Sequence, residues 1–297
     1  MLGGLCQRVV VFSLLLAVSG IMLARLASGI RQQAPIAPSS SSSPAAAVAA
    51  FAATAANRSR SSLAAKASSA MSPALRYRAP IVVPARKQPH TATIVVLHGL
   101  GDTGDGWAGS APELAAAVPH ARLVFPHAPE RPISLNFGMR MPGWYDIKSL
   151  EDIDQREDRE GILESQRYVL DGLVSGAGGS GAGRTAVVGF SQGGAIALAA
   201  LRGSVRLAGV VGMSTYVPLR KEVPLVSAAN AATPILLCHG DADAVVAYDF
   251  GLAASELLKN ATKAPVEFKT YRGMAHSANP EELRDVAAFL KRVLPPV

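Results

Sequence analysis

The chain has 297 residues, of which 49% are hydrophobic and 17% charged, so it can bury a large core and is not disordered throughout. Its two cysteines, Cys6 and Cys238, exclude a disulfide-rich scaffold and a zinc module built from several cysteines. The net charge of +7, taken alone, would favour nucleic acid or an anionic membrane as partner.

The positive charge is concentrated near the N-terminus. Residues 1–78 contain eight Lys and Arg side chains and no Asp or Glu, whereas residues 79–297 contain 21 cations and 22 anions. We therefore divide the chain into an N-terminal extension, 1–78, and a near-neutral globular domain, 79–297. Aromatic and basic side chains are not interleaved in the extension, so we expect no nucleic-acid partner.

The extension begins with an apolar run at 9–23, flanked by arginines. This run is long for a signal-peptide core and short for a membrane-spanning helix. A Ser/Ala/Arg-rich tract follows, with the composition of an organellar transit peptide. We expect the extension to direct the protein to an endomembrane or organelle, and segment 9–23 is a candidate for membrane association. The alternatives are a linker without a targeting role and a cytosolic form that starts at Met71.

The globular domain alternates strand-like and helix-like segments. Short apolar, β-branched runs predict strands at 81–83, 93–97, 123–125, 185–190, 207–213, 235–238 and 266–271. Helical spacing predicts helices at about 112–118, 162–174, 195–201, 252–260 and 280–294. Strands that are apolar throughout are buried on both faces, which indicates an α/β fold with a mostly parallel central sheet covered by helices on both sides. Such sheets carry their functional groups in the loops at the carboxyl ends of strands.

A nucleophile motif follows one of these strands. The segment GFSQG at 189–193 fits Gly-x-Ser-x-Gly and lies between a predicted strand and a predicted helix. In that context the serine occupies a sharp turn, with glycines beside it because side chains there would clash. We therefore predict Ser191 as a nucleophile.

A nucleophilic serine needs a base, and the base needs an orienting acid. Hydrolases with this motif order the three along the chain as Ser, Asp, His. Asp241 and Asp243 both follow the strand 235–238, and His276 follows the strand 266–271. Asp243 is favoured because Asp241 directly follows a glycine and is better placed to turn the backbone. His239, in the same loop, is expected to shape the turn rather than bind a metal, since no other ligand has metal-site spacing.

An oxyanion hole needs two backbone N–H groups, one from the residue after the nucleophile and one from the loop after an early strand. Gln192 occupies the first position. The loop HGLGD at 98–102 follows the strand 93–97 and offers the N–H of Leu100 as the second. We expect His98 to fix this loop rather than act as a base.

Five segments together resemble the acyl-protein thioesterases, which are grouped with small carboxylesterases and lysophospholipase-like enzymes in one family of α/β-hydrolases. They are LHGLGDTGDGW at 97–107, FPHAPERPISLNFGMRMPGWYDI at 125–147, GFSQGGAIAL at 189–198, HGDADAVV at 239–246 and GMAHSANPEEL at 273–283. The resemblance covers about 78–294, so residues 79–297 are expected to be the catalytic domain. Ala244 departs from the family, which commonly has proline there.

The resemblance implies Ser191 as nucleophile, Asp243 as orienting acid and His276 as base, with Leu100 and Gln192 as oxyanion donors. It also places Leu135, Met141 and Trp144 beside the acyl-binding channel, and it implies no cofactor or metal. The expected activity is hydrolysis of acyl thioesters or carboxylic esters, with S-acylated proteins or acyl-ester lipids as substrates. An acyl-protein (S-palmitoyl) thioesterase is favoured over a small-ester carboxylesterase or lysophospholipase. A non-catalytic binding protein on the same scaffold is the remote alternative.

Overall fold

The computed structural model describes residues 76–297, apart from 151–155 and 177–179. Of the predicted N-terminal extension, only residues 76–78 fall within this part of the chain. Its targeting role and the apolar segment 9–23 therefore lie outside the described residues.

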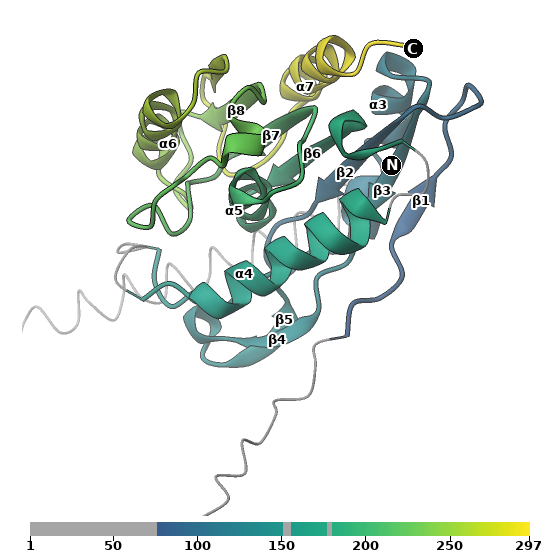
Figure 1. The fold of residues 1–297 in the computed structure, drawn as a ribbon. Helices are drawn as coiled ribbons and strands as arrows, with labels where there is room; N and C mark the ends of the chain where they lie inside the picture. Colours follow the sequence, from purple (N-terminus) through teal and green to yellow (C-terminus); the bar gives the residue numbers. More distant parts are fainter. Residues whose placement is uncertain (1–75, 151–155, 177–179) are drawn as a thin grey trace, which may run out of the picture. The chain divides into compact units, whose positions relative to one another are not determined.

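One sheet runs through the described part of the chain in the order β1-β3-β2-β6-β7-β8-β9 (Figure 1). Only β1 is antiparallel to its neighbour, β3, and all other neighbours are parallel. The predicted mostly parallel sheet is thus confirmed. The strands are β1 (Ile81–Val83), β2 (Ala92–Leu97), β3 (Ala121–Phe125), β6 (Thr185–Phe190), β7 (Gly209–Met213), β8 (Ile235–Gly240) and β9 (Val266–Tyr271).

The central strands are apolar throughout because each supplies two cores. In β8, Ile235 and Leu237 point into the core on one face, and Leu236 and Cys238 into the core on the other. This alternation follows from the two-residue repeat of a strand. It is the reason why these strands read as continuous apolar runs rather than as alternating ones.

Helices cover both faces of the sheet. The face that includes Leu237 is packed by α4 (Arg159–Arg167), α5 (Gln192–Ala199) and α6 (Tyr248–Ala261). The opposite face is packed by α2 (Gly104–Ala108), α3 (Ala111–Ala117) and α7 (Pro280–Val293). A π-helical segment, Tyr168–Ser175, continues α4, which accounts for the single long helix predicted over 162–174. Among the described residues, we find no helix with the length and apolar character needed to cross a bilayer.

A two-stranded hairpin that the sequence patterns did not predict lies beside α4 (Figure 1). It consists of β4 (Glu130–Ile133) and β5 (Met139–Pro142), paired antiparallel. The buried Arg131 of β4 faces two carboxylates of the α4 region, Asp158 at 3.7 Å and Glu164 at 3.9 Å. These ion pairs hold the hairpin near the carboxyl end of the sheet.

Candidate active site

The predicted catalytic side chains come from three loops at one edge of the sheet. Ser191 follows β6, Asp243 follows β8 and His276 follows β9. Because these strands run parallel, their carboxyl ends lie along the same edge, and residues far apart in the chain meet there.

Ser191 has the backbone conformation of a strained turn. Its φ is 54° and its ψ is −119°, a region that non-glycine residues rarely adopt. The flanking glycines make the turn sterically feasible. A Cβ on Gly189 would come within 3.0 Å of the Gly193 carbonyl group, and one on Gly193 would come within 3.0 Å of the His98 carbonyl oxygen.

Ser191, His276 and Asp243 form a continuous line of hydrogen bonds. Ser191 Oγ lies 3.0 Å from His276 Nε2, and His276 Nδ1 lies 2.7 Å from Asp243 Oδ2. Because the carboxylate only accepts, it assigns the imidazole proton to Nδ1 and leaves Nε2 free to accept from the serine hydroxyl. This is the arrangement that a general base needs.

The Asp243 carboxylate is buried and fully hydrogen-bonded. Its Oδ1 accepts from the backbone N–H groups of Val245 and Val246, each at 2.9 Å. Burial acts to raise the pKa of Asp243, but hydrogen bonds from His239 and His276 outweigh it and hold that pKa well below its ordinary value. Asp243 therefore stays ionised beside His276.

Asp241, the competing acid in the sequence, has a different contact. Its Oδ1 accepts from the backbone N–H of Gly273 at 2.6 Å, so it ties the acid loop to the loop that carries His276. The two loops also meet at Gly240, where a Cβ would come within 3.0 Å of the Met274 carbonyl oxygen. The structure thus brings Asp243, and not Asp241, against the imidazole.

The two predicted oxyanion donors flank the nucleophile. Gln192 follows Ser191 directly, and the loop before Leu100 passes so close that a Cβ on Gly99 would lie 3.4 Å from the Ser191 Cβ. Within the described residues, the backbone N–H groups of Leu100 and Gln192 donate no hydrogen bond, whereas that of Gly101 donates to Pro142 O at 2.8 Å. Two N–H groups beside the serine hydroxyl are thus left for a ligand.

His98 supports this loop from within. Its Nδ1 donates to the Gly99 carbonyl oxygen at 2.7 Å, and its Nε2 accepts from the Ala128 N–H at 2.9 Å. Burial lowers the pKa of His98 to about 4, so the ring is neutral and its acceptor nitrogen is preserved at neutral pH. Both ring nitrogens of His98 are thus hydrogen-bonded to backbone groups, in line with the expected structural role.

Gln192 has a second role that the sequence motif did not indicate. Its side-chain Oε1 accepts from the Trp144 N–H at 2.8 Å, and its Nε2 donates to the Tyr145 carbonyl oxygen at 2.6 Å. The residue after the nucleophile therefore anchors the segment that follows β5. A glutamine side chain can form such a two-point bridge to a backbone, but only the folded structure reveals its partner.

The three predicted substrate-binding residues lie around this segment. Trp144 is fully buried, donates from Nε1 to the His98 carbonyl oxygen at 2.8 Å and accepts at its own carbonyl from Ser165 Oγ. Leu135 and Met141, from the hairpin, are half-buried and pack against the core that contains Trp144. Contact of all three residues with substrate stays a prediction, and Trp144 also supports the loop that contains His98.

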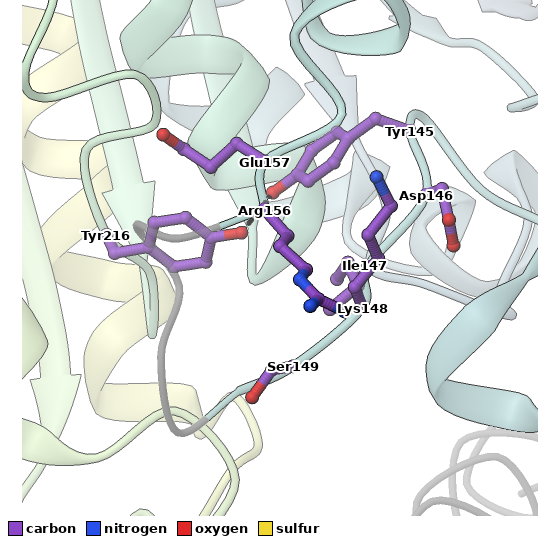
Figure 2. Close-up of a pocket in the computed structure, with 8 residues that line it drawn as sticks. All are labelled: Tyr145, Asp146, Ile147, Lys148, Ser149, Arg156, Glu157 and Tyr216. Carbon is purple, nitrogen blue, oxygen red and sulfur yellow. Dashed lines mark hydrogen bonds between the residues drawn. The ribbon is translucent and has the colours of Figure 1, made fainter. Parts of the chain in front are cut away.

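An open pocket lies next to the anchored segment (Figure 2). Its walls include Tyr145, whose carbonyl Gln192 holds, and Tyr216, from the loop after β7. The two tyrosine hydroxyls lie 2.6 Å apart, and burial raises the pKa of both above the ordinary value, so both are protonated. Each hydroxyl has one proton, and one of these two protons forms the hydrogen bond between the tyrosines. The second is available to an acceptor in the pocket.

Charged side chains complete the pocket in balanced numbers. Lys148 and Arg156 are opposed by Asp146 and Glu157. Asp146 accepts from Ser134, and Glu157 accepts from the Leu219 N–H. The lining therefore has no net charge but is distinctly polar. In the described part of the chain, no group of three His, Cys, Asp or Glu side chains is arranged to hold a metal ion.

The sequence matches a known family over almost the whole of this fold. The family model described as phospholipase/carboxylesterase matches residues 79–294. The chain belongs to this family. A crystal structure of a phospholipase/carboxylesterase from Dyadobacter fermentans, 18% identical, has a similar fold with a TM-score of 0.58.

Relatives within the family are similar over nearly their full length. The protein named acyl-protein thioesterase 1 of Gibberella zeae is 44% identical over 230 residues, which cover 73% of this chain and 97% of that protein. Acyl-protein thioesterase 1 of Yarrowia lipolytica is 42% identical over 216 residues, covering 70% of this chain and 94% of that protein.

The fold agrees with crystal structures of similar proteins. Zea mays acyl-protein thioesterase 2 has a TM-score of 0.65 at 33% identity and covers 72% of this chain and 98% of its own. Arabidopsis thaliana SOBER1 has a TM-score of 0.63 at 31% identity and covers 68% of this chain and 99% of its own. The α/β-hydrolase fold expected from the sequence is thus confirmed.

Proposed function

We propose that this protein is a serine hydrolase that cleaves acyl thioesters on proteins. The observation that carries the proposal is the line of hydrogen bonds from Ser191 through His276 to Asp243, at 3.0 and 2.7 Å. It begins at a serine whose backbone is held in a strained turn beside two N–H groups with no other partner among the described residues. A binding protein on this scaffold would not need these features together, so the non-catalytic alternative is disfavoured.

The geometry gives each residue a step in acyl transfer. Ser191 Oγ attacks the acyl carbonyl carbon and its proton passes to His276 Nε2, while Asp243 keeps the imidazole oriented and stabilises its positive charge. The N–H groups of Leu100 and Gln192 bind the oxygen on which negative charge develops, a contribution of about 2.7–4 kcal/mol for a single donor.

The attack gives a tetrahedral intermediate, which collapses to an acyl-enzyme that is then hydrolysed. The carbon–sulfur bond cleaves, and the leaving thiolate takes the proton from His276 Nε2. A water molecule next gives a proton to Nε2 and attacks the acyl-enzyme, and collapse of that intermediate releases the carboxylic acid and returns the proton to Ser191 Oγ.

The substrate class rests on the relatives. Proteins of 40–44% identity over most of this chain are named acyl-protein thioesterases, which favours an S-acylated protein as substrate. Small-ester and lysophospholipid hydrolysis are the alternatives, because the matching family is described as phospholipase/carboxylesterase. The polar pocket beside Tyr145 and Tyr216 is our candidate for binding the part of the substrate next to the scissile bond.

A three-substrate comparison tests the proposal. The purified full chain is assayed on an S-palmitoylated peptide, lysophosphatidylcholine and a short-chain p-nitrophenyl ester, each with Ser191→Ala as control. We expect the highest kcat/KM on the palmitoylated peptide and no turnover or fluorophosphonate labelling of the variant. Equal or faster turnover of the short ester rejects the thioesterase assignment, and labelling of Ser191→Ala rejects the nucleophile.

We also propose that residues 1–78 direct the enzyme to an endomembrane or organelle. The support is the sequence alone, an apolar segment at 9–23 and an acid-free basic tract. A fusion of residues 1–78 to a fluorescent protein tests this, with the same reporter on residues 71–297 as control. Diffuse cytosolic signal from the first fusion rejects a targeting role.

A further inference from the structure

A second imidazole lies against the orienting acid. His239, the fifth residue of β8, is buried, and its Nε2 lies 2.9 Å from the Val246 carbonyl oxygen and 3.5 Å from Asp243 Oδ2. Both neighbours only accept hydrogen bonds, so Nε2 has the proton, which it gives chiefly to Val246 and more weakly to Asp243. His239 is thus in contact with both ends of the turn from 243 to 246.

This turn is what holds the carboxylate. Oδ1 of Asp243 accepts from the N–H groups of Val245 and Val246. The position of the carboxylate therefore depends on the backbone conformation of these two residues. The His239 bond to the Val246 carbonyl fixes the turn from its far end. Its longer contact to Oδ2 restrains the oxygen that His276 uses.

Helix α6 is shaped to keep the His239 ring in place. A Cβ on Gly251 would come within 3.0 Å of His239 Nδ1, so the absence of a side chain there makes room for the imidazole. Tyr248 meets the ring edge-on at 5.9 Å between centroids, and its hydroxyl is hydrogen-bonded to Thr270 of β9 at 2.5 Å. Among the described residues, the titratable groups in contact with the ring are Asp243 from its own loop and Tyr248 from α6, and Asp243 also contacts His276.

We propose that His239 is a positioning residue for the active site, which holds Asp243 in the orientation that His276 requires. The inference rests on the proposed serine-hydrolase function, and it assigns His239 no contact with substrate. By sharing Oδ2, its N–H also withdraws part of the negative charge that would otherwise stabilise protonated His276. Loss of the N–H should therefore lower turnover and move the acid limb of the pH–rate profile to higher pH.

The test compares His239→Phe, which keeps a planar ring without a donor, with His239→Gln, whose amide N–H can reach the place of Nε2. We expect His239→Phe to lower kcat on a p-nitrophenyl ester by about tenfold or more, with KM changed by less than about twofold, because the substrate site is untouched. Its acid limb should shift to higher pH, and His239→Gln should recover most of the lost kcat. Fluorophosphonate labelling of Ser191 should slow in parallel.

Gly251→Ala tests the position of the imidazole without changing His239, because the added Cβ would push the ring away from Asp243 and Val246. The matched control is Gly209→Ala, where a Cβ would also be crowded, against Val293 and Phe289 of α7. Gly209 is the first residue of β7, whereas Asp243 lies beyond the carboxyl end of the neighbouring strand β8. We expect Gly251→Ala to share the shifted acid limb and Gly209→Ala to keep the native pH profile even where it lowers Tm.

Three results would overturn the proposal. They are a folded His239→Phe with native kcat and pH profile, equal impairment of the Phe and Gln variants, and loss of folding in both His239→Phe and Gly251→Ala, which would assign the ring to stability alone. Failure of the proposed thioesterase function is separate, since it appears in the native enzyme as absent turnover of the palmitoylated peptide.

Discussion

The backbone of Gly193 passes the carbonyl oxygen of His98 with no room for a side chain between them. Gly193 lies in the first turn of α5, and His98 precedes the loop that supplies Leu100. The close approach therefore fixes the distance between the two halves of the proposed oxyanion hole.

Gly193→Ala should separate these halves. A displacement of about 1 Å can cost about 10²-fold in rate, so we expect a fall in kcat of that order, measured on a p-nitrophenyl ester. Gly109→Ala is the control, because a Cβ at Gly109 has no atom within 4 Å. Native kcat in Gly193→Ala would show that the spacing is not needed.

The Gln192 side chain can be separated from the Gln192 N–H by substitution. Gln192→Leu keeps the oxyanion donor but leaves the Trp144 N–H and Tyr145 carbonyl without their partner, a penalty of about 1–3 kcal/mol for each buried group. Gln192→Glu, with its carboxyl protonated, keeps the acceptor for Trp144 and offers one O–H to the Tyr145 carbonyl in place of the amide N–H. At a pH where the new carboxyl is protonated, we expect urea unfolding to show the native protein as the most stable, then Gln192→Glu, then Gln192→Leu. The reverse order of the two variants would contradict the two-point bridge from Gln192 to Trp144 and Tyr145.

Glu282 in α7 should make stability depend on pH. The side chain is fully buried, and neither carboxyl oxygen has a hydrogen-bond partner among the described residues. Burial raises the pKa of Glu282 to about 8. Because the folded pKa lies above the reference value of 4.5, its stabilising effect is complete below that pH and is lost as the pH rises to about 8.

Glu282→Gln removes this dependence, since the amide does not ionise. At about pH 8.5 the variant should exceed the native protein in free energy of unfolding by a few kcal/mol, whereas at about pH 4.5 the two should be similar. Urea denaturation at both values measures the difference. A constant difference at the two pH values would argue against a buried, ionising carboxyl.

Tyr216→Phe should alter acyl-chain selectivity. It removes one hydroxyl from the Tyr145–Tyr216 pair and makes the pocket wall more apolar. If the acyl chain enters this pocket, the ratio of kcat/KM for a palmitoyl over a butyryl thioester should rise by about tenfold, the size of effect that small changes in an apolar pocket produce. An unchanged ratio would place the acyl chain elsewhere, and His120→Gln, a buried change outside the pocket, serves as control.

The sequence predicted the central sheet well because its strands are buried on both faces. Continuous apolar runs mark β2, β6, β7 and β8, and the loops that follow them contain the motif residues. The hairpin of β4 and β5 was missed because it lacks such a run. Its strands include Pro132 and Pro142 and hold a buried cation, Arg131, whose partners Asp158 and Glu164 belong to a distant segment.

The active site also contains features that the sequence could predict and features that it could not. The order of Ser191, Asp243 and His276 could be predicted because each follows a strand, and parallel strands share an edge. The Gln192 bridge, the Asp241 tie to Gly273 and the His239 contact to Val246 could not, because each depends on which loops become neighbours in the fold. The assignment of Trp144 to the acyl channel, which came from the resemblance, stays a prediction, and its ring packs with those of His98 and Tyr168.

The turn at Ser191 also limits which atoms this position can offer as a nucleophile. With φ at 54°, a side chain branched at Cβ collides with its own backbone, so threonine cannot replace serine there although it has the same hydroxyl group. Cysteine branches no more than serine and fits the turn. The backbone, rather than the reaction, thus disfavours a nucleophile branched at Cβ and leaves the unbranched ones, serine, cysteine and aspartate.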